Sequence, residues 1–163
     1  MRRQECPYLK YKRPQLERTV MNSAESQQHS TAAPRQVVIL TEGYSTPFYA
    51  KTACSYIRYR TDEVVALIDS TQLGKTAEAL LDVGGDIPVV ASLSAAPTAN
   101  TLLLGIAPPG GKLPEEWKAL ILEALGRKML IISGLHDFLS DDVEIAAAAE
   151  KLGGCIVDIR KND

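Results

Sequence analysis

Residues 101–107 read TLLLGIA, the strongest apolar run of the chain. The run has the length of a strand and is apolar on both faces, as a central strand of a parallel sheet must be. Two prolines and two glycines follow at 108–111, and Pro114 then opens the strongest helical pattern, 114–126. The apolar stripe of that helix consists of Trp117, Leu120, Ile121, Ala124 and Leu125. This strand–loop–helix unit predicts an α/β domain with Leu104 and Trp117 in its core.

Strand-like and helix-like segments alternate on both sides of this unit. Apolar runs predict strands at 37–40, 64–68, 88–91, 101–107, 129–133 and 155–159. Helical periodicity predicts helices at 48–59, 76–81, 114–126 and 141–152, with a weakly helical stretch at 94–99. Asp141 and Glu144 are spaced as a capping pair for the last helix, and Gly153 is its stop.

This alternation predicts a parallel sheet covered on both faces, because right-handed crossovers place the helices on its sides. We therefore expect the α/β fold class: a doubly wound, mostly parallel, six-stranded Rossmann-like sheet. The expected strand order is 3-2-1-4-5-6, and a flavodoxin-like order is the alternative.

Composition narrows the classes of protein. The chain has 163 residues, enough for one domain, and 45% of them are apolar and 23% charged, which excludes collagen-like, disulfide-stapled and wholly disordered proteins. No run reaches the roughly 18 apolar residues of a membrane helix. Residues 1–36 carry a net charge of +4 and the remaining residues −6, so the acidic body disfavours a nucleic-acid partner.

Two regions are expected: a disordered basic and polar arm over residues 1–36 and a Rossmann-like domain over 37–163. The arm shows neither helical nor strand periodicity, so it cannot repay the entropy of ordering, and we expect it to be dispensable for stability. Met1 and Met21 are both plausible starts of translation.

The cysteines Cys6, Cys54 and Cys155 are scattered, with no CxxC motif and with two histidines in the whole chain. This pattern predicts no metal site. An odd, scattered cysteine count suits a reducing compartment. The Arg2-Arg3 pair is not followed by the apolar region of a secretion signal, so we expect a cytoplasmic protein that does not bind membranes.

Ligands of such sheets bind at the carboxyl ends of the strands, where the strand order reverses. The loops expected there are 41–47, 69–75, 107–112 and 133–137. The first carries one glycine, Gly43, in place of the GxGxxG fingerprint, and Glu42 beside it would repel phosphate. Ordinary NAD binding is therefore disfavoured.

The second loop holds two candidate residues. Asp69 ends the second strand, where an acid either binds a ribose hydroxyl or caps the following turn. Gly74-Lys75-Thr76 resembles the end of a P-loop, but Asp69 stands where the first glycine of that motif is required. Lys75 near a helix N-terminus would suit a carboxylate or a single phosphate.

The third and fourth loops hold the remaining candidates. Gly110 and Gly111 could present backbone N–H groups to an anion, or simply form a rigid strand exit. His136 follows the fifth strand and is either a ligand contact or a structural histidine. No catalytic triad can be assembled, so the catalytic residues stay unknown. The predicted ligand-binding residues are Asp69, Lys75, Gly110, Gly111 and His136.

Several segments carry a family resemblance. They are AKTA at 50–53 with IRY at 57–59, IDST at 68–71 with GKT at 74–76, LGIAPPGG at 104–111, SGLHDFLSDD at 133–142 and VDIRK at 157–161. Over about 37–161 the chain resembles the N-terminal Rossmann-like domain of the DgcN family, which is D-glutamate N-acetyltransferase-like. The resemblance implies relatives about twice as long, with a C-terminal domain resembling P-loop nucleotide-binding enzymes and with acetyl-coenzyme A as donor.

Two functional hypotheses follow. The first is a small-molecule-binding domain for an anionic ligand, a nucleotide or coenzyme A, belonging to a DgcN-type N-acetyltransferase-like protein. Such a domain is expected to be inactive alone, to act with a separately encoded P-loop domain protein, and to form a homo-oligomer. The alternative is a non-catalytic oligomerisation or scaffold module.

Overall fold

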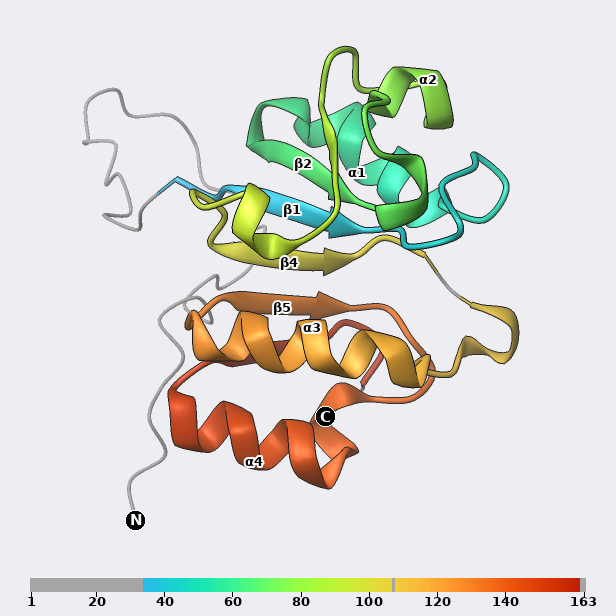
Figure 1. The fold of residues 1–163 in the computed structure, drawn as a ribbon. Coiled ribbons are helices and arrows are strands. Elements are labelled where there is room, and N and C mark those ends of the chain that lie inside the picture. Colours follow the sequence, from blue (N-terminus) through green and yellow to red (C-terminus); the bar gives the residue numbers. More distant parts are fainter. Residues whose placement is uncertain (1–33, 107, 162–163) are drawn as a thin grey trace, which may run out of the picture. The chain divides into compact units, whose positions relative to one another are not determined.

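The domain is built on a six-stranded sheet in which every pair of neighbouring strands is parallel. The computed structural model describes residues 34–106 and 108–161. The strands are β1 (Val37–Leu40), β2 (Val64–Ile68), β3 (Val89–Val90), β4 (Thr101–Leu104), β5 (Leu130–Ser133) and β6 (Cys155–Asp158). Their order, β3-β2-β1-β4-β5-β6, confirms the predicted doubly wound arrangement over the flavodoxin-like one (Figure 1). Of the disordered arm expected over residues 1–36, residues 1–33 lie outside the described residues, whereas the Gln36 N–H donates to Asn100 Oδ1 at 3.0 Å.

Within the described residues, four α-helices cover the sheet: α1 (Lys51–Arg60), α2 (Ala77–Leu81), α3 (Glu115–Gly126) and α4 (Val143–Leu152). The chain winds one way from β1 to β3 and the other way from β4 to β6, so right-handed crossovers place α1 and α2 on one face and α3 and α4 on the other (Figure 1). Leu104 and Trp117 are both buried, which confirms their predicted place in the core. Among the described residues, none of the helices is long and apolar enough to cross a membrane.

The first helix begins later than predicted. We expected a helix from residue 48, but α1 starts at Lys51, because residues 46–49 form turns closed by the Ala50 N–H donating to the Thr46 carbonyl at 2.8 Å. Phe48 and Tyr49 therefore lie on an exposed turn and not on the apolar face of the helix. The buried face of α1 consists of Ala53, Cys54 and Ile57. Burial raises the pKa of the free Cys54 thiol, as expected of a core cysteine.

The last helix has a different cap from the one predicted. Asp142, not Asp141, is the N-cap of α4: its Oδ1 accepts from the N–H groups of Glu144 and Ile145, both at 3.0 Å. Asp141 instead ends a short 3₁₀ turn, Leu139–Asp141, that precedes the cap. The Glu144 side chain turns away to Lys118 of α3 at 2.9 Å, so the predicted capping pair is wrong by one residue. Gly153 ends the helix in the left-handed conformation, as predicted.

The cap of α4 should make stability depend on pH. Hydrogen bonding from the Ile145 N–H, together with Lys118, lowers the pKa of Asp142 below its ordinary value. A carboxyl whose folded pKa is depressed stabilises the fold above its unfolded pKa of about 3.9, and this contribution is lost as the pH falls through the folded value. Asp142→Ala should therefore cost about 1 kcal/mol at pH 7 and progressively less below about pH 4.

Urea unfolding of the wild type and of the Asp142→Ala variant between pH 3 and pH 7 measures this difference. Glu150→Gln, which changes an exposed acid of the same helix, is the matched control and should shift stability at pH 7 by less than about 0.5 kcal/mol. A cost of Asp142→Ala that stays constant down to pH 3 would show that the carboxylate charge is not what stabilises the cap.

Candidate functional site

The loops that follow the strands meet at the carboxyl edge of the sheet, the side to which the arrows of Figure 1 point. The central pair at this edge is β1 and β4, because the strand order reverses between them. Of the four loops predicted to build a site there, the structure describes all residues except Ala107.

Asp69, at the end of β2, is fully buried and holds two loops together. Its Oδ2 accepts from the Ser45 hydroxyl at 2.5 Å, and its Oδ1 accepts from the Thr71 N–H at 3.0 Å and the Thr71 hydroxyl at 2.6 Å. The Ser45 hydroxyl also contacts Thr41 Oγ1 at 2.9 Å. Both oxygens of the Asp69 carboxylate thus have protein donors. Asp69 has the capping role that the sequence offered as one of two, and because it is fully buried it could reach a ribose only if the loops above it moved.

Glu42 joins the same two loops a second time. Its carboxylate accepts from the Ser70 N–H at 2.8 Å and from the Ser70 hydroxyl. Two carboxylates therefore occupy the loops after β1 and β2, where a dinucleotide-binding sheet would place backbone N–H groups against a pyrophosphate. The negative charge of this part of the edge disfavours phosphate binding, as we expected from Glu42 in the sequence. Ser45 and Ser70, which make these links, were not predicted, because nothing in their spacing marks them.

Lys75 lies toward the outer side of the sheet. Its side chain is exposed and donates to Gln72 Oε1 at 2.7 Å, and its carbonyl accepts from the Val89 N–H of β3 at 3.1 Å. The neighbouring Thr76 is the N-cap of α2, with its hydroxyl accepting from the Ala79 N–H at 3.3 Å. Because α2 is five residues long, the helix supplies little of the dipole that the predicted phosphate contact would need.

Gly111 and His136 are in direct contact, and they join the loops after β4 and β5. The Gly111 carbonyl accepts from the His136 N–H at 3.1 Å and the Asp137 N–H at 3.3 Å. A Cβ on Gly111 would lie 2.3 Å from His136 Cδ2, so this position has room for glycine alone, in its left-handed conformation at φ +67°. The Gly111 N–H donates to the Pro108 carbonyl at 2.8 Å, so the predicted presentation of this N–H to an anion would require that turn to open.

The five predicted residues fall into two groups. Gly110, Gly111 and His136 follow β4 and β5, whereas Asp69 and Lys75 follow β2. Strands β2 and β5 are three places apart in the sheet, about 14 Å at the usual strand spacing of about 4.8 Å. A small ligand on His136 would therefore not touch Lys75 as well. His136 is exposed and lies against Gly111, so its imidazole is a donor that this half of the edge presents to solvent.

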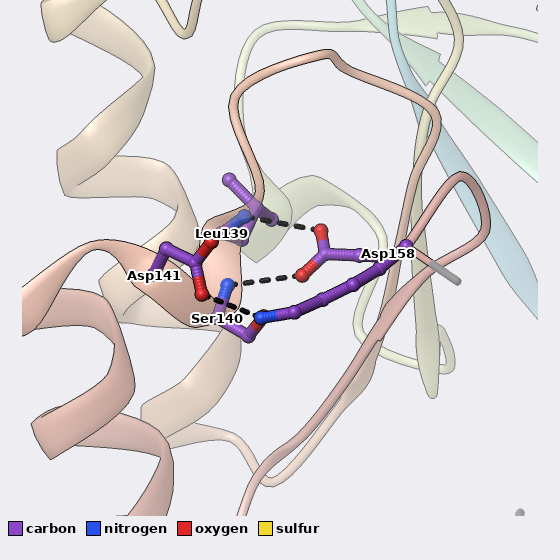
Figure 2. A network of polar contacts seen from close by, with 5 residues as sticks. Leu139, Ser140, Asp141 and Asp158 are labelled. Carbon is purple, nitrogen blue, oxygen red and sulfur yellow. Dashed lines mark hydrogen bonds and ion pairs between the residues drawn. The ribbon is translucent and has the colours of Figure 1, made fainter. Parts of the chain in front are cut away.

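Residues at and just after the end of β6 hold the loop that follows β5 in place (Figure 2). The Asp158 carboxylate accepts from the N–H groups of Leu139 and Ser140, both at 3.0 Å. Lys161 donates to the Ser140 hydroxyl at 2.9 Å and to Asp141 Oδ1 at 2.5 Å. Two of the segments that carry the family resemblance, 133–142 and 157–161, are thus bonded to each other. Sequence reasoning did not assign Asp158 this role.

A shallow groove of about 530 Å³ lies elsewhere, along the outer surface of α1. It is lined by Lys51, Thr52, Ser55, Tyr56, Tyr59 and Arg60. Two of these lining residues bind Glu63, which accepts from the Tyr56 hydroxyl at 2.6 Å and pairs with Arg60 at 3.2 Å. Across residues 34–106 and 108–161, no cluster of three or more His, Cys, Asp or Glu side chains could hold a metal ion.

The strand order and the loops at the carboxyl edge define a Rossmann-like α/β domain. The chain belongs to a family described as a domain of unknown function, DUF1611_N, a Rossmann-like domain, whose model matches residues 70–162, more than half of the chain. This match confirms the family resemblance and the fold predicted from the sequence.

Two curated relatives and one solved structure resemble the chain. The relatives are each a D-glutamate N-acetyltransferase, from Tritonibacter scottomollicae at 42% identity and from Pseudoalteromonas sp. at 40%, both over 62 residues. That match covers 38% of this chain and 19% of each relative, in the N-terminal part. The structure is that of a DUF1611 family protein from Anabaena variabilis ATCC 29413, with a TM-score of 0.69 and 30% identity, covering 79% of this chain and 38% of that one. The chain therefore spans well under half of the proteins that it matches.

Proposed function

We propose that this domain binds an anionic small molecule at the carboxyl edge of its sheet, as the Rossmann-like part of an N-acetyltransferase-like protein. The observation that carries the proposal is the 42% identity over 62 residues to a D-glutamate N-acetyltransferase. The substrate of that relative is an acidic amino acid and its reaction uses an acetyl donor, so D-glutamate and coenzyme A are the ligand classes to test.

One half of the edge offers this ligand an exposed side-chain donor. Glu42 and Asp69 place two carboxylates on the loops after β1 and β2, and like charges repel. The loops after β4 and β5 present the exposed His136 against Gly111, and an imidazole can donate to a carboxylate or a phosphate. We therefore assign the anion to His136 and its glycines, and we give Lys75 no direct contact with it.

Acetyl transfer is expected to need a protein portion beyond this domain. The described loops hold no assignable nucleophile–base pair, and the matched relatives are much longer. We propose that acetyl transfer requires a P-loop domain, carried on the same chain or encoded separately, and that this chain alone shows no turnover. Self-association of the domain is a further expectation that sedimentation would measure.

Calorimetric titration of the full chain with D-glutamate, coenzyme A and adenine nucleotides tests the ligand proposal. Weak binding of at least one of them is expected, with His136→Ala raising the Kd about tenfold, since losing a hydrogen bond to a charged group is worth about 1.4 kcal/mol or more. Lys75→Ala should change the Kd less than twofold. Lys151→Ala, at the C-terminal end of α4 and away from this edge, is the matched control.

Two results would contradict the ligand proposal. One is the absence of binding for every ligand, and the other is a Kd that His136→Ala leaves unchanged. Either result would favour the non-catalytic oligomerisation or scaffold role. Acetyl transfer to D-glutamate by the purified chain alone would separately contradict the requirement for a further domain.

A further inference from the structure

Large apolar side chains are exposed at the same edge of the sheet as the candidate site. Phe48 is 71% exposed, Leu73 56%, Val143 85% and Ile159 61%, and Tyr49 is exposed beside Phe48. They come from four segments: the turn before α1, the loop after β2, the first residue of α4 and the residues after β6. Each segment follows the carboxyl end of a parallel strand, so all four lie at one edge. We name these five residues the apolar edge.

The opposite edge of the sheet provides a comparison. Tyr59 and Leu152 are the other large apolar side chains that are exposed within the described part of the chain, and they lie at the C-terminal ends of α1 and α4. Those helix ends return the chain to the amino ends of the strands. Five of these seven exposed side chains therefore lie at the carboxyl edge and two at the amino edge, and this uneven distribution makes the carboxyl edge the candidate for an interaction surface.

Part of the apolar edge is preorganised. The rings of Phe48 and Tyr49 meet edge to face with their centroids 5.0 Å apart, and Tyr49 meets Tyr44 in the same way at 5.7 Å. Lys51 lies over the Phe48 ring at 5.2 Å from its centroid. Aromatic side chains already held by one another lose little conformational freedom on binding, which is a property of interface anchors.

The path of the chain indicates what covers this edge. Strand β6 is the last strand and is parallel to the others, so it delivers the chain to the carboxyl edge, where the Ile159 N–H donates to the Ser133 carbonyl at 2.9 Å. The match to the curated relatives lies in their N-terminal part, and the solved relative has 62% of its length outside the matched region, since 38% is covered. In such relatives, polypeptide that follows this domain starts at the apolar edge.

We propose that the apolar edge is the docking surface for the folded protein portion that follows this domain in its longer relatives, whether that portion is on the same chain or on another. The partner face is therefore apolar and meets Phe48, Tyr49 and Ile159. This inference rests on the proposed function for its partner. It places the anion site around His136 between two protein surfaces, where ligand sites of multidomain proteins are concentrated.

Side-chain labelling by hydroxyl radicals, read by mass spectrometry, tests the docking surface. The full chain is compared with the same chain fused after Asp163 to the portion of the Tritonibacter scottomollicae enzyme that follows that enzyme's own counterpart of this domain. Labelling of Phe48, Tyr49 and Ile159 should fall at least threefold in the fusion, while labelling of Tyr59 and Leu152 stays the same. A Phe48→Ser/Ile159→Ser fusion should restore the labelling of Tyr49, and a Tyr59→Ser/Leu152→Ser fusion should not.

Unchanged labelling of the apolar edge in the fusion overturns the proposal, and so does protection that falls equally on Tyr59 and Leu152. Protection that appears in the unfused chain as its concentration rises would assign the edge to a second copy, which also overturns it. The measurement uses no ligand. Its failure is therefore distinguishable from a failure of the titration with D-glutamate and coenzyme A, which tests the proposed function.

Discussion

Leu104→Ala should lower the free energy of unfolding by about 2–5 kcal/mol. Leu104 is 1% exposed and ends β4, the strand that lies between β1 and β5 at the centre of the sheet. It is in register with Leu40 of β1. Truncation removes buried methyl groups and leaves a cavity that strands bonded on both sides cannot close. The cost is therefore the lost transfer free energy of those groups plus the free energy of the cavity.

Chemical unfolding at 25 °C measures this loss. Leu73→Ala is the matched control, because Leu73 is 56% exposed and the same truncation there should cost less than about 0.5 kcal/mol. If Leu104→Ala unfolds at the same denaturant concentration as the wild type, Leu104 is not in the central strand.

Gly105→Ala should destabilise the domain by about 1–3 kcal/mol, although it adds a single methyl group. A Cβ at Gly105 would lie 2.3 Å from Ile39 Cγ2 and 3.0 Å from the Cβ of Ala53 in α1. Its carbonyl also accepts from the Ala53 N–H at 2.8 Å. Helix α1 packs so closely on the end of β4 that the added methyl must move either the helix or the strand.

The same substitution at Gly126 is the control for Gly105→Ala. Gly126 ends α3, has open space around its Cα and lacks a left-handed conformation, so Gly126→Ala should be neutral or stabilise by up to about 1 kcal/mol. A melting temperature that falls for Gly105→Ala and does not fall for Gly126→Ala would support close packing at Gly105. Equal effects would mean that the close approach at Gly105 does not exist.

Much of the fold was predictable because its signals are local. The strands at 37–40 and 64–68 were predicted at their observed limits, since apolar β-branched runs bounded by turn residues have few other interpretations. The alternation and right-handed crossovers predicted a doubly wound parallel sheet and left two strand orders open, of which the structure has the expected one. The ends were harder to predict. The strand expected over 101–107 ends at Leu104, and beyond it the Gly105 carbonyl accepts from the Ala53 N–H of α1, a tertiary contact that periodicity does not encode.

The candidate site was predictable at the level of loops but not of bonds. The sequence located Asp69 and His136 at strand ends, and the structure confirms those positions. Neither the partnership of Asp69 with Ser45 nor the contact of Gly111 with His136 has a sequence signal, since each joins loops 24 or more residues apart through side-chain geometry. The separation of Lys75 from His136 follows from strand order and could have been inferred once that order was predicted.

Amide chemical shifts of the ¹⁵N-labelled full chain measure most directly where the anion binds. Titration with D-glutamate, and separately with coenzyme A, should shift the amides of Gly110, Gly111 and His136 together with those of residues 134–138. The amides of Glu42, Ser70 and Lys75 should move little, because carboxylates line those loops. Shifts that concentrate on the loops after β1 and β2 or on the groove along α1, or no shifts with either ligand, would contradict the assignment.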